Sequence, residues 1–341
     1  MDIENSNVRK IKGGITSPKG YYATGSHIGI KEKKKDLAII SSSVPTKAVG
    51  VFTTNIVKAA PVLWNQKLIR NNNLAQAIVV NSGNANACTG EIGLQHAELM
   101  ANELAICLGL RKDQVFVAST GVIGVPLPID NIINGIKNTY KKLGNSEIDA
   151  NLAAEAIMTT DKHSKEVSVE FTIDEREIRI GGMAKGSGMI HPNMATMLSF
   201  ITTDLNISKE LLEKALKESS EDSYNMISVD GDTSTNDMVI LMANGFDEPN
   251  MGLSEAAILY PDTNPAPAPI QVEPSEITAN HHDDNWPSLE APSDPPPVPV
   301  EVAPQATGGT YINDAGEVLA HVDKPEKQIK PDDEFPDDIP F

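Results

Sequence analysis

The sequence predicts a layered α/β or α+β domain followed by a tail of different composition. Short apolar strands alternate with amphipathic helices through residues 1–246, without an internal repeat. That region has 27 acidic and 25 basic residues, whereas residues 247–341 have 20 acidic residues, 3 basic residues and 17 of the 23 prolines. We therefore expect a nearly neutral globular domain over 1–246 and an acidic, Pro-rich, mostly disordered tail over 247–341.

The first element with a clear pattern is a strand at 77–80, where four apolar residues run into the turn-forming residues 81–84. A helix follows over 97–108, because its apolar residues recur at helical spacing and Gly109 is a common helix stop. The next apolar run, 115–118, predicts a second strand. Strand, helix and strand in this order are typical of a layered α/β region.

The following elements complete this pattern. The apolar residues of 129–140 lie on one helical stripe, and Gly144 is the expected end of that helix. Alternation of apolar and polar side chains over 167–173 predicts a half-exposed strand, and 178–180 continues it as the second arm of a hairpin. Ser208 is suited to cap a further helix, because apolar residues follow it at helical spacing.

Composition argues against several classes of protein. A net charge of −19 argues against a basic nucleic-acid-binding face, and no apolar run reaches the roughly 18 residues of a membrane span. The N-terminus lacks the basic and apolar stretches of a secretory signal. Cys88 and Cys107 are too few for a disulfide scaffold, so we expect a reduced, cytoplasmic setting.

The segment 181–196 is the most unusual part of the domain, because Lys185 lies among closely spaced glycines. Glycine-rich loops can bring backbone N–H groups to an anion, but neither the P-loop nor the dinucleotide spacing is present. A tight turn between a strand and a helix-like apolar run is the competing interpretation. Ser119-Thr120-Gly121, at a strand end, can also supply N–H groups to an oxyanion, although most such turns have no catalytic role.

No metal site is predicted. The aspartates of 230–237 are spaced as in a calcium loop, but the glycine at position six and the distal glutamate are absent, which favours a polar turn near a site. The seven histidines form neither a zinc-protease nor a zinc-finger spacing. From these patterns alone, the sequence indicates an enzyme-like domain with glycine-rich loops and leaves its reaction open.

Seven segments, occurring in one order, resemble those of the glutamate N-acetyltransferase family of arginine biosynthesis, also called ornithine acetyltransferases. The segments are 13–20, 50–55, 81–87, 119–124, 157–161, 185–196 and 230–237. Together they cover 10–245 almost without a gap. The resemblance implies an α/β fold, a layered sheet-and-helix sandwich of the self-processing type that uses an N-terminal threonine.

The resemblance implies that the chain cuts itself between Ala195 and Thr196. The Thr196 hydroxyl would attack the preceding carbonyl, and hydrolysis of the ester would free an α-amino group on the same residue. An α-amine titrates near about pH 8, so it can act as the base for its own hydroxyl. The implied reaction moves an acetyl group from N-acetylornithine to Thr196 and then to glutamate.

Further roles are implied for residues at matching positions. Thr120 and Gly121 would form the oxyanion hole, while Thr159, Lys185 and Thr196 would bind the substrate, Lys185 through a carboxylate. No cofactor is implied, although acetyl-CoA is an alternative acetyl donor. The cleaved α and β fragments are expected to associate with each other. A relative of the same fold with aminopeptidase activity is a further alternative.

The sequence also departs from the family. Family members carry an Asp-Gly-Glu-Gly-Ala-Thr and an Asp-Pro-Asn-Trp-Gly segment in their last third, and neither has a counterpart after Gly245 in this sequence. We therefore expect a truncated domain with an open apolar face and impaired activity. The residues up to Phe341 resemble the acidic tip of bacterial single-stranded-DNA-binding proteins, which docks in a protein pocket. A non-catalytic interaction chain acting through this tip is therefore the alternative function. In the tail, a weak hairpin is expected at 308–322.

Overall fold

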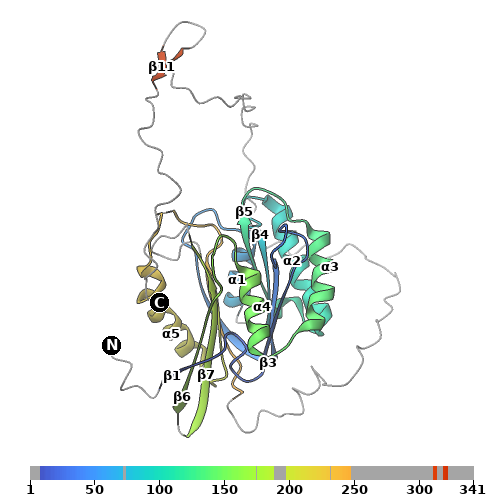
Figure 1. Ribbon diagram of the computed structural model, residues 1–341, viewed down its shortest axis with the longest axis vertical. Coiled ribbons are helices and arrows are strands. Elements are labelled where there is room, and N and C mark those ends of the chain that lie inside the picture. Colours follow the sequence, from blue (N-terminus) through green and yellow to red (C-terminus); the bar gives the residue numbers. More distant parts are fainter. Residues whose placement is uncertain are drawn as a thin grey trace, which may run out of the picture. The chain divides into compact units, whose positions relative to one another are not determined.

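The computed structural model describes residues 8–71, 74–173, 175–187, 197–230 and 232–246, and the backbone of 310–312 and 318–321. Its contacts divide the chain into two units, Met1–Pro267 and Ala268–Phe341. The first unit contains a mixed β-sheet with helices on its faces (Figure 1). Apart from the two short backbone stretches, the tail predicted over 247–341 lies outside the described residues.

The sheet has the strand order β1-β6-β7-β8-β9-β3-β4-β5, and β2 also pairs with β3. Two pairs are parallel, β4 with β5 and β8 with β9, and the other pairs are antiparallel. The strands are β1 (Arg9–Ile11), β2 (Tyr21–Ser26), β3 (Leu37–Phe52), β4 (Ala75–Asn84), β5 (Val115–Val122), β6 (Lys165–Ile173), β7 (Arg176–Lys185), β8 (Leu198–Thr203) and β9 (Met238–Ala243).

The 16-residue strand β3 joins the two parts of this sheet. Its first part pairs with β2 and β4, and its second part pairs with β9, where Val49 lies opposite Leu241. The register with β4 shifts between Ser41 and Thr46, close to the point where the strand changes partners. One continuous strand therefore belongs to both the β2–β5 part and the β1–β9 part.

Helices pack on the faces of both parts (Figure 1). α2 and α3 cover one face of β3, β4 and β5, where Leu37 is part of a buried cluster. A larger core, which includes Phe116 and Phe200, joins side chains of both parts with those of α1 and α4. α5 packs on β3 and β9 through Leu212 and Leu216. The helices are α1 (Ala60–Arg70), α2 (Gly90–Leu108), α3 (Ile129–Thr139), α4 (Glu147–Ile157) and α5 (Lys209–Glu221).

Local sequence explains where three of these helices begin or end. The Ser146 hydroxyl accepts the Asp149 N–H, and the Asp149 carboxylate accepts the Ser146 N–H, so α4 begins with a capping box. The predicted cap of α5 is confirmed, because the Ser208 hydroxyl accepts the N–H of Leu211. α2 ends at Gly109, whose φ of 68° lies in the left-handed region that glycine adopts without strain.

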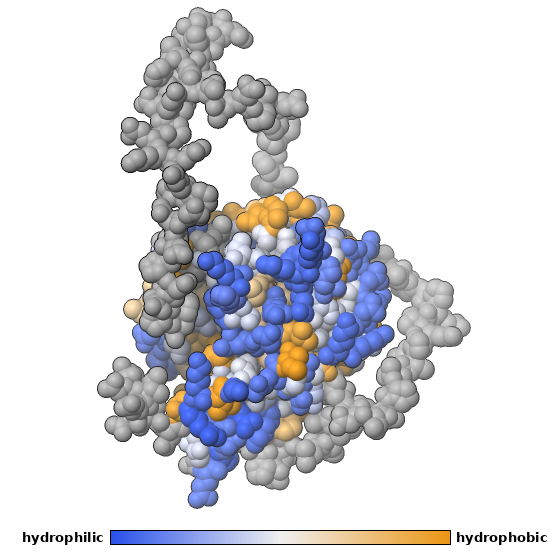
Figure 2. All heavy atoms as spheres, in the orientation of Figure 1, coloured by the Kyte–Doolittle hydropathy of each residue, from blue (hydrophilic) through white to orange (hydrophobic). Residues whose placement is uncertain are grey.

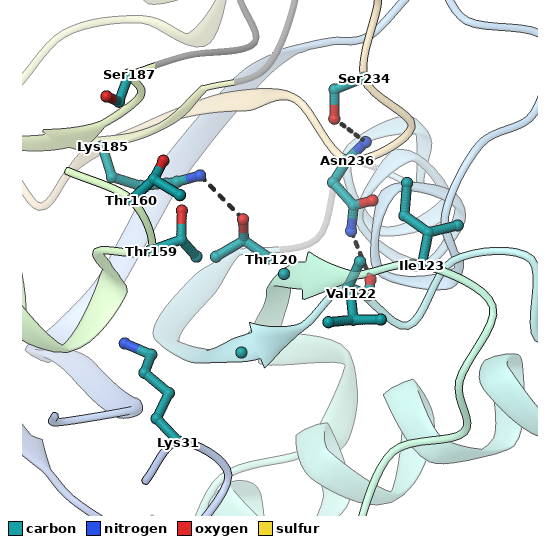
Figure 3. Close-up of a pocket in the computed structure, with 13 residues that line it drawn as sticks. Lys31, Thr120, Val122, Ile123, Thr159, Thr160, Lys185, Ser187, Ser234 and Asn236 are labelled. Carbon is teal, nitrogen blue, oxygen red and sulfur yellow. Dashed lines mark hydrogen bonds between the residues drawn. The ribbon is translucent and has the colours of Figure 1, made fainter. Parts of the chain in front are cut away.

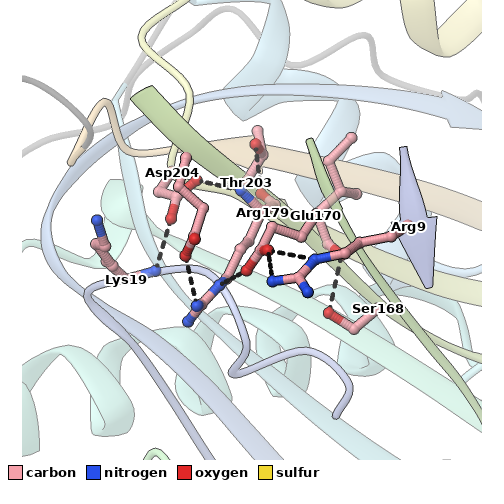
Figure 4. A network of polar contacts seen from close by, with 9 residues as sticks. Arg9, Lys19, Ser168, Glu170, Arg179, Thr203 and Asp204 are labelled. Atoms are coloured by element: carbon pink, nitrogen blue, oxygen red, sulfur yellow. Dashed lines mark hydrogen bonds and ion pairs between the residues drawn. The ribbon is translucent and has the colours of Figure 1, made fainter. Parts of the chain in front are cut away.

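A polar network links the neighbouring strands β1, β6 and β7 (Figure 4). The Nε atoms of Arg9 and Arg179 lie 2.8 Å and 3.0 Å from the two carboxylate oxygens of Glu170. Asp204, which follows β8, is buried and accepts the backbone N–H groups of Lys19 and Arg179 at 3.0 Å and 2.8 Å. Burial raises the pKa of the Asp204 carboxyl. Asp204 therefore links the β7–β8 side of the sheet to the loop before β2.

Most of the predicted elements are confirmed, and two expectations are wrong. β4, α2, β5, the β6–β7 hairpin and α5 lie where the sequence places them. α3 ends at Thr139 and continues into the 3-10 turn Tyr140–Lys142, because Gly144 is recruited to a bridge with Ala23. The apolar run after the glycine-rich segment is strand β8 and not a helix, because it completes the sheet between β7 and β9.

In the second unit, β10 (Thr310–Ile312) and β11 (Val318–His321) pair in antiparallel fashion. This confirms the hairpin expected at 308–322. The acidic tip that ends at Phe341 lies outside the described residues. None of the helices in the described ranges is both long enough and apolar enough to cross a membrane.

Candidate active site

A cavity of about 570 Å³ lies where several strand ends and loops of the first unit meet (Figure 3). Four of the residues predicted from the sequence line it together, namely Thr120, Gly121, Thr159 and Lys185. The fifth residue assigned to substrate and catalysis, Thr196, lies outside the described residues, as does Ala195.

The cavity forms at the carboxyl ends of the parallel strands β4 and β5. Ser82 pairs with Thr120, and Gly83 pairs with Gly121, so the two strands end side by side. Lys185 is the last residue of β7, and its partner in the sheet is Leu198, the first residue of β8. Strand ends from both parts of the sheet therefore contribute to one site.

Gly121 occupies a position where no side chain fits. Its φ is 135°, and a Cβ placed there would lie 2.2 Å from the carbonyl carbon of Gly83 and 2.5 Å from the backbone nitrogen of Asn84. Both neighbours are main-chain atoms of β4, which have no rotamer through which to move away. Glycine at this position is therefore what allows β4 and β5 to approach each other at the cavity.

Lys185 and Thr120 form a buried polar pair. Lys185 is buried, with 5% of the residue exposed, and its ammonium donates to Thr120 Oγ1 at 3.0 Å (Figure 3). Burial lowers the pKa of the Lys185 amine, opposed by the charges of Asp161 and Asp237. Because the Thr120 oxygen accepts from Lys185, the Thr120 hydroxyl can still donate its own proton to another acceptor. The pair can thus direct a donor and a positive charge at one point in the cavity.

The buried carboxylate of Asp161 connects two walls of the cavity. It accepts the backbone N–H of Gly186 at 2.9 Å, that of Thr159 at 3.2 Å and the Lys165 ammonium at 2.6 Å. Burial alone would raise the pKa of Asp161, but these hydrogen bonds hold it below its ordinary value. Asp161 therefore keeps Thr159 at a fixed position relative to the end of β7.

Asn236 holds a third wall of the cavity in place. Its side-chain amide donates to the carbonyl oxygen of Ala85, which follows β4, at 2.6 Å, and to that of Ser119, which lies within β5, at 2.8 Å. It therefore fastens the loop before β9 to the ends of both parallel strands. Asn236 lies in the segment 230–237, which was predicted to be a polar turn near a site, and the structure confirms that position.

Asp237 holds Met197, the residue that precedes strand β8. Its carboxyl accepts the N–H of Met197 and hydrogen-bonds with Ser234, and the N–H of Met238 donates to the Met197 carbonyl at 3.1 Å. Burial raises the pKa of Asp237 to about 8, although both hydrogen bonds act to lower it. Met197, the residue after Thr196, is therefore held through both of its main-chain polar groups.

The raised pKa of Asp237 predicts a pH dependence of stability. The folded chain binds one more proton than the unfolded chain between the ordinary pKa near 3.9 and the folded value, so stability falls as the pH rises through that window. Asp237→Asn should remove this decline. We expect the difference in the free energy of unfolding between about pH 5 and about pH 8 to shrink by something on the order of 2 kcal/mol, measured by denaturant titration.

Asp161→Asn is the matched control for that measurement. The pKa of Asp161 is lowered, so its contribution to stability is fully present above the unfolded pKa and is lost only as the pH falls below it. This variant should be destabilised equally at about pH 5 and about pH 8. An unchanged pH slope in Asp237→Asn would contradict the assignment of the slope to Asp237.

Apolar side chains rim one side of the cavity. Val122, Ile123 and Val125, at and beyond the end of β5, are 60%, 46% and 49% exposed. Figure 2 shows an apolar patch over this end of β5. Val122 and Ile123 also line the cavity, so its mouth is bounded by apolar surface on this side.

The structure adds residues that the sequence did not single out. Lys31 and Gly83 line the cavity together with Asn236. Gly83 and Asn236 lie within segments that carried the family resemblance, whereas the only signal for Lys31 was a lysine-rich stretch, 31–35, of the kind usual on surfaces. Within the described ranges, no three potential metal-ligating side chains cluster, including those of the calcium-like segment.

Comparison with known sequences identifies relatives for most of the first unit. The ArgJ family model matches residues 22–260. The arginine biosynthesis bifunctional protein ArgJ 1 of Clostridium acetobutylicum is 58% identical over 232 residues, which are 68% of this chain and 56% of that protein. The ArgJ protein of Thermotoga neapolitana is 56% identical over 229 residues, 67% of this chain and 57% of that protein. The chain thus spans somewhat more than half the length of these curated relatives.

Solved structures give the same result. A crystal structure of ArgJ from Bacillus halodurans is 44% identical with a TM-score of 0.54, over 56% of this chain and 100% of that chain. The ornithine acetyltransferase of Mycobacterium tuberculosis, solved in complex with ornithine, is 37% identical with a TM-score of 0.51, over 54% of this chain and 98% of that chain. The predicted α/β fold and the resemblance stated from the sequence are both confirmed.

Proposed function

Because the chain belongs to the ArgJ family, we propose that it carries the catalytic residues of an ornithine acetyltransferase that moves acetyl from N-acetylornithine to glutamate. The observation that best supports this is the hydrogen bond from Lys185 to Thr120, beside Gly121, in the cavity that Thr159 also lines. A relative solved with ornithine bound supports an amino acid as the ligand.

The proposed reaction has two half-reactions. The Thr196 Oγ attacks the acetyl carbonyl of N-acetylornithine while its proton passes to the free α-amine of the same residue. The tetrahedral intermediate then collapses, the C–N bond breaks, and ornithine leaves with that proton. The amine of glutamate attacks the resulting ester, and N-acetylglutamate leaves as the Thr196 hydroxyl forms again.

Thr120 and Gly121 are proposed to stabilise the negative oxygen of each tetrahedral intermediate. A hydroxyl polarised by Lys185 and the backbone N–H of Gly121 are both suitable donors, and each such donor contributes roughly 3 kcal/mol to the transition state. The close approach of β4 and β5 fixes the position of these groups before the substrate arrives. That rigidity supports the role, because oxyanion stabilisation depends on donors that do not have to reorganise.

Substrate binding is proposed to involve Thr159, Lys185 and Thr196. Lys185 can bind a carboxylate through a charge-assisted hydrogen bond, and Thr159 offers a hydroxyl in the same cavity. Asp161 supports both assignments, since it holds Thr159 and the residue after Lys185 through their N–H groups.

Acetyl-CoA can load Thr196 as a second acetyl donor. The unpaired Cys88 and Cys107 agree with a cytoplasmic setting.

Self-cleavage at the Ala195–Thr196 bond is proposed to leave two fragments that stay together. β7 lies before the bond and β8 after it, and the two strands pair from Ile180 with Thr203 to Lys185 with Leu198. β9 also pairs with β3 from the other fragment. Hydrogen bonds on both sides of the β8–β9 pair, together with the shared core, would hold the fragments as one folded unit.

Denaturing electrophoresis of the purified chain tests this proposal. Fragments of 195 and 146 residues should appear, and Thr196→Ala should abolish them because the attacking hydroxyl is gone. Incubation of the cleaved chain with N-acetylornithine should add about 42 daltons to the fragment that begins with Thr196, as expected for an acetyl ester.

Thr172→Ala provides a matched control, because Thr172 is exposed on β6 and does not line the cavity. This variant should be cleaved and acetylated like the original chain. A chain that stays uncut and never carries the acetyl mass would overturn the proposed function.

A further inference from the structure

A second lysine reaches the same cavity from another part of the chain. Lys31 lies in the loop between β2 and β3, whereas Lys185 lies at the end of β7. Figure 3 shows the two side chains entering the cavity from different segments, with Thr120 and Thr159 in the region between them. The proposed reaction assigns no role to Lys31.

The loop that carries Lys31 is held by a buried carboxylate. Asp36, which is 0% exposed, accepts the backbone N–H groups of Ile28 at 2.6 Å, Ile30 at 2.8 Å and Lys31 at 2.9 Å. Three hydrogen bonds to one charged group fix the path of the loop more firmly than neutral bonds would. The backbone of Lys31 is therefore in a defined position at the wall of the cavity.

The side chain of Lys31 is also held in place. Its ammonium donates to the carbonyl oxygens of Lys35 at 2.7 Å and Met158 at 2.6 Å, and Met158 directly precedes Thr159. Gly83 provides the space for the stem, because a Cβ at Gly83 would lie 3.1 Å from Lys31 Cγ. A lysine ammonium has three N–H groups. Two of them donate to these carbonyl oxygens, and the third has no hydrogen-bond acceptor among the described residues.

The charge of the cavity indicates what this third N–H group binds. Lys31 and Lys185 both line the cavity, and none of the described residues that line it is an aspartate or a glutamate. Two ammonium groups that share a partly enclosed space repel each other and favour a ligand that brings negative charge to both. A ligand with one carboxylate would satisfy only one of them.

We propose that Lys31 binds a second carboxylate in this cavity, so that the site prefers a dicarboxylate of amino-acid size over the corresponding monocarboxylate. This proposal rests on the proposed function in one respect, namely that glutamate is the acceptor that brings two carboxylates. Lys185 receives one of them and Lys31 the other. In the second half-reaction, Lys31 would thereby distinguish glutamate as the acceptor from its amide analogue and from other acceptor amino acids without an acidic side chain.

The ionisation of Lys31 agrees with this role. Burial lowers the pKa of the Lys31 amine to about 8, in the same direction as the charges of Lys34 and Lys185, whereas Asp36 and Asp161 oppose the change. A bound carboxylate favours the charged amine and raises this pKa again. Dicarboxylate binding should therefore weaken as the pH rises past about 8.

Calorimetric titration of the full chain with glutarate and glutaramate tests the proposal. The two ligands have the same length, but glutaramate has an amide in place of one carboxylate, and neither carries an acetyl group that could be transferred. We expect the original chain to bind glutarate about tenfold more tightly than glutaramate, as is usual for one charge-assisted hydrogen bond. Lys31→Gln should abolish this preference by weakening glutarate binding alone.

Two further variants make the test specific. Lys31→Arg keeps the positive charge and should retain part of the preference, and Lys33→Gln, which removes an exposed charge from the same loop, should leave the preference intact. The preference of the original chain should also decline between about pH 7 and about pH 9, whereas Lys31→Gln, which has no preference, should show no such decline. Equal weakening of both ligands in Lys31→Gln would show a merely structural role, and equal binding of both, or of neither, by the original chain would overturn the proposal. Self-cleavage and acetylation do not enter this measurement, so its outcome is separate from that of the proposed function.

Discussion

Gly121→Ala should lower the free energy of unfolding by about 4 kcal/mol, an unusually large loss for the addition of one methyl group. Two effects add together. A φ of 135° is strained for any residue with a side chain, which costs about 1–3 kcal/mol. The new Cβ would also lie 2.2 Å from a main-chain carbon of Gly83, and such overpacking costs about 1–3 kcal/mol. Denaturant titration gives the size of the loss.

Gly124→Ala separates these two effects. Gly124 has a φ of 82°, but a Cβ there meets nothing within 4 Å. We expect it to cost only about 1–2 kcal/mol, the backbone contribution alone. Gly121→Ala should also prevent acetylation of Thr196, because separating β4 from β5 displaces Thr120. If the two variants lose the same stability, the close approach of β4 and β5 does not constrain the site as described.

Lys185→Met should reduce the rate of Thr196 acetylation by roughly 10²-fold or more while leaving the chain as stable as before, or more stable. The two effects differ because a buried ammonium is costly for the fold but useful in the reaction. Methionine fills a similar volume without the cost of burying a charge. The same replacement removes the positive charge beside Thr120, to which Lys185 donates at 3.0 Å. Mass spectrometry over time gives the rate, and thermal denaturation gives the stability.

Lys165→Met is the matched comparison for this variant. Lys165 pairs with buried Asp161 at 2.6 Å, so its loss leaves a carboxylate with one partner fewer. We expect a loss of about 2 kcal/mol of stability, typical of a hydrogen bond to a charged group. Lys165→Met should therefore lose stability, whereas Lys185→Met should lose none. Equal destabilisation by both would contradict the prediction that the Lys185 ammonium does not stabilise the fold.

Elements with strong local signals could be predicted from the sequence, and elements defined by distant partners could not. The cap at Ser208 and the stop at Gly109 are encoded within a few residues, and both are found as predicted. β8 was expected to be a helix, because its apolar run has no clear alternation. The run is almost wholly buried between β7 and β9, and burial on both faces removes the period-two pattern that identifies a half-exposed strand.

The site shows the same division. Thr120, Gly121, Thr159 and Lys185 were expected from a family resemblance, and the structure brings all four to one cavity. Lys31 could not have been selected in this way, because its position depends on three hydrogen bonds to Asp36 and on the space left by a glycine in another strand. Nothing in the order of the lysines between 31 and 35 distinguishes the one that enters the cavity.

The shared strand β3 determines how the cavity can respond to a ligand. Because its two parts hydrogen-bond to different neighbours, the walls contributed by β5 and by β7 are connected through one continuous backbone. A movement of the two walls away from each other would have to bend that strand or break its hydrogen bonds to β4 and β9. The fold therefore resists separation of these two walls, and we expect the distance between β5 and β7 to stay the same when a ligand binds.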